Sequence, residues 1–212
     1  DTIAETVAST VAAGRASTVR EFVRRYLAET DPHELVRRPA ATIAAVLADH
    51  WRLGVDRRAP IEVRTLAIGD AAAQASVLLV VMEDVPFLVD SIHTVLTRHA
   101  LGIHLTIHPM LDVRRDIDGS IVDVGGPDGV VEAWTMVEFE ACDAATRASV
   151  EREVCAVLED VRSSMADREP MRQRAMSLAL QAERSGRPDG EGDAAVHRQN
   201  AGTVDGDTVR GL

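Results

Sequence analysis

The spacing of apolar residues changes at residue 61, and this change constrains the fold more than any other feature of the sequence. Up to residue 55, apolar residues recur every three or four positions, which is typical of amphipathic helices. From residue 61 onward, segments appear in which apolar and polar residues alternate, which is typical of strands. The sequence therefore predicts an N-terminal helical segment over residues 1–55 and an α/β domain over residues 61–166.

The α/β domain combines strand and helix patterns. Strand patterns cover residues 62–68, 76–82, 103–114 and 130–140. Helix patterns cover residues 86–100 and the segment from Asp143 to Met165. The order strand, strand, helix, strand, strand, helix predicts the α+β class, as a two-layer, ferredoxin-like sandwich of an antiparallel sheet and two helices. In this arrangement the 62–68 strand takes an edge position.

The end of the chain differs in character from the α/β domain. Residues 170–184 have the pattern of one further, C-terminal helix. Residues 185–212 contain six glycines and no aromatic residue. Such a composition cannot bury enough apolar surface to form a core, so we expect this segment to be a disordered tail.

The charge balance limits the partners that this chain can have. It carries 23 basic and 34 acidic residues, a formal net charge of −11. Proteins that bind nucleic acids or anionic membranes normally show a basic surface instead. The sequence contains no signal peptide and no apolar run of about 18 residues. We therefore expect a cytoplasmic protein with neither nucleic acid nor membrane among its partners.

The sequence does not contain the residue patterns of a catalytic or metal centre. Glycine-rich nucleotide motifs and the Gly-x-Ser-x-Gly motif are absent. All 23 basic residues are arginine, so Schiff-base chemistry through a lysine is impossible in this chain. His104 and His108 would lie about 13 Å apart on one strand, too far to bind one metal ion. Cys142 and Cys155 have no partner motif.

Two central motifs resemble one protein family. Residues 82–92 read Met-Glu-Asp-Val-Pro-Phe-Leu-Val-Asp-Ser-Ile, and residues 102–109 read Gly-Ile-His-Leu-Thr-Ile-His-Pro. Together they closely resemble the N-terminal region of the large bacterial NAD-specific glutamate dehydrogenases. In that family an Asp-x-Pro-Phe-Leu-Val-Asp-Ser helix start precedes an Ile-His-Leu-x-x-His-Pro strand. The resemblance extends from about Val19 to about Met176.

The resemblance implies an ACT-type module with a regulatory and assembly role, upstream of the catalytic domain. The parent enzyme oxidatively deaminates L-glutamate to 2-oxoglutarate, with NAD bound in its catalytic domain. That domain lies outside this sequence, so we expect a non-catalytic chain without a cofactor of its own. The implied partners are the rest of the dehydrogenase chain, other subunits of a homo-oligomer and a free amino acid. A stand-alone amino-acid-binding ACT module and a purely structural interaction domain are the alternatives.

The resemblance places a candidate effector-binding turn where the second strand leads into the first helix of the α/β domain. Its residues are Glu83, Asp84, Val85, Phe87 and Leu88. Free backbone N–H groups at a helix start attract a carboxylate, although Pro86 removes one of these donors. In the alternative interpretation, Asp84 caps the helix and Phe87 joins the core.

One face of the predicted sheet is a candidate interface. It carries a mixture of apolar and polar side chains: His104, Thr106, His108, Met110, Trp134 and Met136. A semi-apolar face of this kind is suited to protein contacts. Alternatively, the N-terminal helices cover it.

Overall fold

The computed structural model describes residues 2–11, 14–28, 30–69 and 74–185. The chain divides into two compact units, Asp1–Met165 and Ala166–Leu212. All the sites described below lie in the first unit. The expected tail beyond Ser185 lies outside the described residues.

Four helices form the N-terminal segment: α1 (Thr2–Val11), α2 (Ala16–Tyr26), α3 (Pro32–Val36) and α4 (Ala40–Val55). α3 has a typical helix start, because the Asp31 side chain accepts a hydrogen bond of 2.8 Å from the His33 amide and Pro32 occupies the first turn. The apolar stripe of α2 is buried from Val19 to Tyr26. These helices therefore form a packed layer with its own apolar face.

Six strands form one antiparallel sheet: β1 (Ile61–Gly69), β2 (Gln74–Glu83), β3 (Ile103–Ile107), β4 (Met110–Arg115), β5 (Ile121–Val124) and β6 (Val130–Glu140). Their order is β1-β2-β6-β4-β5, and β3 also pairs with β6. The continuously apolar strand β2 is central and buried on both faces, as its sequence predicts. The predicted 103–114 strand is interrupted at His108-Pro109, so it forms β3 and β4.

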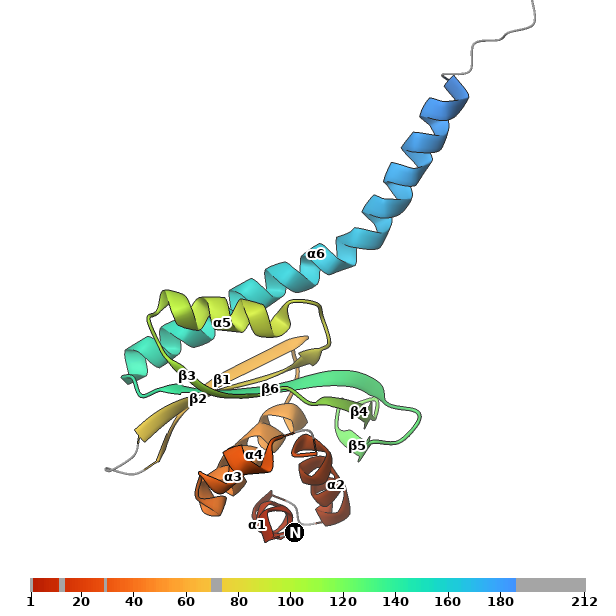
Figure 1. Ribbon diagram of the computed structural model, residues 1–212. Helices are drawn as coiled ribbons and strands as arrows, with labels where there is room; N and C mark the ends of the chain where they lie inside the picture. The colour runs from red at the N-terminus through yellow and green to blue at the C-terminus, as the bar shows by residue number, and fades with distance from the viewer. Residues whose placement is uncertain (1, 12–13, 29, 70–73, 186–212) are drawn as a thin grey trace, which may run out of the picture. The chain divides into compact units, whose positions relative to one another are not determined.

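Helices cover both faces of the sheet, as Figure 1 shows for the layers above and below it. One core packs β2 and β6 against α5 (Leu88–Arg98) and the first turns of α6 (Ala144–Ser185). The other core packs the opposite face of the sheet against α1, α2 and α4. The prediction of an antiparallel sheet with two helices is confirmed, and the N-terminal helices add a third layer.

The strand order is that of a ferredoxin-like sheet. β2, α5 and β3 form a crossover between parallel strands, with β6 paired between them. The position at the edge beside β2 belongs to β1, which precedes the crossover in the chain. The described part of the chain contains no strand after α6, which runs through the expected 170–184 helix to Ser185. Of the two strand–helix–strand crossovers of a ferredoxin-like fold, the described residues therefore form the first.

The core beneath the N-terminal helices is centred on a buried indole. The Trp134 ring lies 4.9 Å from the ring of Phe22 and 5.2 Å from that of His50, measured between centroids. His50 is itself fully buried, and its two ring nitrogens contact the Tyr26 hydroxyl at 2.9 Å and the Val80 carbonyl at 3.1 Å. A neutral imidazole satisfies both contacts by accepting from Tyr26 and donating to Val80.

We expect acid to destabilise the folded chain through His50. Burial lowers the pKa of His50 to about 3, whereas an unfolded histidine titrates near 6.5. Below pH 6.5 the unfolded chain binds a proton that the folded chain does not, so stability falls as the pH falls. Between pH 7.5 and pH 5, the free energy of unfolding measured in urea should drop by about 2 kcal/mol from this group.

The matched variant for this prediction is His50→Gln. A glutamine can also accept from the Tyr26 hydroxyl and donate to the Val80 carbonyl, but it does not titrate. The difference in stability between the two pH values should be about 2 kcal/mol smaller in this variant than in wild type. An equal pH dependence in wild type and H50Q would contradict the assignment to His50.

Candidate functional sites

The candidate effector turn connects β2 to α5, and it differs from the alternative interpretation, in which Asp84 caps the helix and Phe87 joins the core. α5 begins after Phe87, which is its N-cap residue and forms no side-chain cap hydrogen bond. Asp84 is therefore not the cap. Phe87 adopts a left-handed conformation with φ 67°, and its side chain is 69% exposed, so it does not join the core. Of the five predicted residues, Leu88 is the one that is buried, where it contributes to the core beneath α5.

The fold brings His108 into the electrostatic environment of this turn. The His108 ring contacts the Thr135 hydroxyl at 2.7 Å. Burial lowers the pKa of His108, and the negative charge of Asp84 opposes that shift. The turn and the end of β3 belong to different motifs of the sequence. In the structure, the charge of Asp84 in the turn affects the pKa of His108, which follows β3. The left-handed Phe87 is a strained residue of the kind that persists at binding turns.

The predicted interface residues do not share one exposed face. Trp134 is fully buried and Met136 is 7% exposed, and both lie beneath the N-terminal helices. These two residues therefore lie on a covered face, as in the alternative interpretation. Thr106 faces the opposite side, where it contacts His93 of α5 at 2.9 Å. The prediction of a single face is therefore corrected.

A β-bulge explains why the predicted face divides. The pairing of β3 with β6 shifts between Ile103, which lies opposite Phe139, and Leu105, which lies opposite Glu138. A one-residue shift reverses the side of the sheet on which all later side chains lie. Alternation in the sequence alone cannot reveal such a shift.

A groove borders the β3 edge of the sheet. One part, of about 310 Å³, lies between α3 and the end of β3, with Asp31 and Glu34 in its lining. The next part, of about 410 Å³, is lined by Glu34, Arg37, Arg38, His104 and Glu138. Arg38 donates to Glu138 at 2.6 Å and to Glu34 at 3.1 Å, which fixes α3 beneath the sheet. Within the described residues, β3 pairs with β6 alone.

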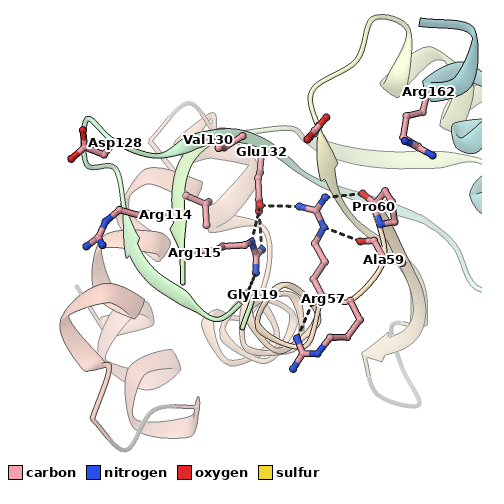
Figure 2. Close-up of a pocket in the computed structure, with 13 residues that line it drawn as sticks. Arg57, Ala59, Pro60, Arg114, Arg115, Gly119, Asp128, Val130, Glu132 and Arg162 are labelled. Atoms are coloured by element: carbon pink, nitrogen blue, oxygen red, sulfur yellow. Dashed lines mark hydrogen bonds and ion pairs between the residues drawn. The ribbon is translucent and has the colours of Figure 1, made fainter. Parts of the chain in front are cut away.

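A second groove, of about 590 Å³, has more arginines than acidic residues in its lining. Its charged lining residues are Arg57, Arg58, Arg114, Arg115, Arg162, Glu83, Asp128 and Glu132. Figure 2 shows Arg57 and Arg115 converging on Glu132, whereas Arg114 points away from them. Glu132 comes from β6, Arg115 from the end of β4, and Arg57 from the loop that precedes β1.

The Glu132 cluster, which we define as Arg57, Arg115 and Glu132, is held together by charged hydrogen bonds. The Glu132 carboxylate accepts from Arg57 at 2.8 Å and from Arg115 at 2.8 and 2.9 Å. Further donors of both guanidinium groups bind backbone carbonyls, including that of Gly54 in α4 and that of Gly119 in the β4–β5 turn. This cluster therefore joins chain segments to one another, and most of its N–H donors are already engaged within the chain.

Sequence reasoning missed this cluster. Arginine is the sole basic residue type of the chain, so neither Arg57 nor Arg115 is distinctive. The available signal was Glu132, an acidic residue on the same strand face as the apolar Trp134 and Met136. A charge at an inward position of a strand requires buried partners.

The described residues contain neither a helix able to span a membrane nor a group of three or more His, Cys, Asp or Glu side chains placed to hold a metal ion. The arrangement of sheet, helices and turn defines an ACT-like α+β domain. The sequence profile of the family described as "Glutamate dehydrogenase, ACT1 domain" matches residues 22–154, more than half of the chain. The chain belongs to this family.

Two relatives are named NAD-specific glutamate dehydrogenase. The protein of Pseudomonas aeruginosa is 29% identical over 170 residues, which cover 74% of this chain and 10% of the relative. The protein of Halomonas elongata is 30% identical over 128 residues, which cover 58% of this chain and 8% of the relative. The chain thus spans about a tenth of the length of these relatives.

Proposed function

We propose that this chain is the N-terminal regulatory and assembly domain of a cytoplasmic NAD-specific glutamate dehydrogenase, and that it performs no dehydrogenase chemistry itself. Its family and the names of its relatives support the parent enzyme. The NAD site, the lysine-dependent deamination and the glutamate substrate belong to the rest of the parent chain. The chain described here contributes contacts to other subunits.

The observation that carries the assembly role is the β3 edge with its adjacent groove. An unpaired strand edge presents backbone N–H and C=O groups that a second strand can bind. The groove beside it carries charges of both signs: Asp31 and Glu34 in one part, and Glu34, Arg37, Arg38 and Glu138 in the other. Antiparallel pairing of two copies about a twofold axis joins the same edge of each copy, so one unpaired edge is sufficient for a homodimer. The unpaired edge therefore supports a homodimer through β3.

Placing a lysine on β3 should prevent this association. Ile103 is 36% exposed at the start of the strand, and a lysine on an edge strand opposes pairing with a second edge. We expect wild type to sediment as a dimer and Ile103→Lys as a monomer in analytical ultracentrifugation. Ile117→Lys is the control, because Ile117 is 99% exposed in the β4–β5 turn, away from β3. A wild-type chain that is monomeric at all concentrations would refute assembly through this edge.

Amino-acid sensing at the β2–α5 turn is the second candidate function. It is supported by the helix start at Phe87, which lacks a side-chain cap, and by the negative charge of Asp84 in the turn, which acts on His108. The first N–H groups of α5 can receive a carboxylate, and Asp84 can receive an ammonium group. Calorimetric titration of the chain with a panel of amino acids tests this role. The absence of heat with every amino acid would eliminate sensing by this chain and leave assembly as its function.

A further inference from the structure

A carboxylate from α6 closes the β1 edge of the sheet. Glu151 accepts a hydrogen bond of 2.7 Å from the Thr65 backbone amide and one of 3.0 Å from the Thr65 hydroxyl. In the described sheet, β1 pairs with β2 alone, so its other side is an edge. The Thr65 amide would otherwise be a free donor on that edge, available to the carbonyl of another strand.

A similar arrangement, with the opposite charge, is found at the β5 edge. Arg15, the N-cap residue of α2, donates to the Ile121 carbonyl at 3.0 Å, and Arg25 of α2 donates to the carbonyl of Gly125, directly after β5, at 3.1 Å. In both places charged side chains from the helical layers occupy backbone groups at an edge strand or next to it. Among the hydrogen bonds between described residues, the backbone of β3 receives no such side chain. Charged side chains therefore occupy backbone groups at the β1 and β5 edges of the described sheet, but not at β3.

We propose that Glu151 is an edge guard, which prevents β1 from pairing with β1 of a second copy of this chain. The carboxylate takes the amide that a partner strand needs, and it places a negative charge where the partner's carbonyls would lie. Inward-pointing charges of this kind are a known means of blocking edge-to-edge association. This inference goes beyond the proposed function, because it concerns a different edge and does not require assembly through β3.

A second copy is the occupant because β1 is complementary to itself. In an antiparallel pair centred on Val63, Glu62 of each strand lies opposite Arg64 of the other, and Ile61 lies opposite Thr65. Both charge pairs are attractive, and opposite charges across a strand pair stabilise it. The strand is also rich in β-branched and aliphatic residues, which favour sheet pairing.

The test is the mass of the full chain in solution after removal of the carboxylate. We expect Glu151→Ala to raise the mass measured by light scattering at least twofold, relative to wild type at the same concentration. Glu151→Gln should associate less than Glu151→Ala, because its amide oxygen still accepts from Thr65 although the negative charge is lost. Glu159→Ala is the control on the same helix, since Glu159 pairs with Arg162 and does not contact the sheet through a hydrogen bond.

A second substitution identifies the edge that is used. Adding Arg64→Glu to Glu151→Ala places like charges opposite one another in the β1 pair, and the mass should return to the wild-type value. Glu151→Ser, which also lacks the carboxylate, replaces Glu151→Ala if the alanine variant does not fold. A folded Glu151→Ala or Glu151→Ser chain with wild-type mass would overturn the proposal. Equal association of Glu151→Gln and Glu151→Ala would overturn it as well. Because every mass is compared with wild type, a failure here leaves assembly through β3 untouched.

Discussion

Replacing Glu132 by alanine should lower the free energy of unfolding by about 4 kcal/mol, which is a large part of the stability of a domain of this size. Glu132 is 4% exposed, and the Arg57 and Arg115 side chains around it are 14% and 17% exposed. Removal of the carboxylate leaves two nearly buried positive charges without a counter-charge. The Trp134 indole N–H, which donates to Glu132 at 3.3 Å, also loses its partner. Urea unfolding at neutral pH measures the loss.

The matched control is Glu159→Ala, which removes an exposed carboxylate that also pairs with an arginine. Exposed ion pairs contribute little, so this variant should unfold at the same urea concentration as wild type. Replacing the whole Glu132 cluster with apolar residues should restore most of the stability, because no buried charge is then left unpaired. An alanine variant of Glu132 as stable as wild type would show that the cluster does not hold these segments together.

Replacing Gly54 by alanine should cost about 3 kcal/mol, in contrast to the usual effect of this substitution in a helix. A Cβ atom at this position would lie 1.9 Å from Cη2 of Trp134 and within 2.7 Å of two further ring atoms. The ring cannot retreat, because Phe22, His50 and the sheet enclose it. We therefore expect a lower melting temperature and an altered tryptophan fluorescence spectrum.

Gly102→Ala is the control for this close approach. A Cβ at Gly102 would have Glu140 as its nearest neighbour, at 3.6 Å, which is an ordinary contact. This variant should retain a melting temperature near that of wild type. If Gly54→Ala were equally well tolerated, the close packing of α4 against Trp134 would be wrong.

The two glycines also show where local sequence rules are insufficient. Gly102 resembles the glycine that ends α5, but the residue with a positive φ there is Ala100, at 55°. The amide of Leu101 donates to the Leu96 carbonyl, so the helix closes before Gly102 is reached. Gly54 has no distinguishing neighbours within its helix, yet it is a position where α4 packs directly against the Trp134 ring. Neither outcome follows from the neighbours of these residues in the chain.

The fold class was accessible from the sequence because it depends on periodicity. The strand alternation in β6, the continuous apolar run of β2 and the helical stripe of α5 each reflect an element with one or two buried faces, and such patterns are local. The family also follows from local motifs, since the segments at residues 82–92 and 102–109 lie within the matched region.

Tertiary structure decided which residues could form sites. A bulge of one residue in β3 divided the predicted interface face, and the third helical layer covered Trp134. Glu132 meets Arg57 across 75 positions of the chain, and Thr65 meets Glu151 across 86. Periodicity identifies the buried side of each element but not which elements meet. The strand register, the ion pairs of the Glu132 cluster and the contact of Glu151 with β1 join distant parts of the chain. They therefore arise only when the layers pack against one another.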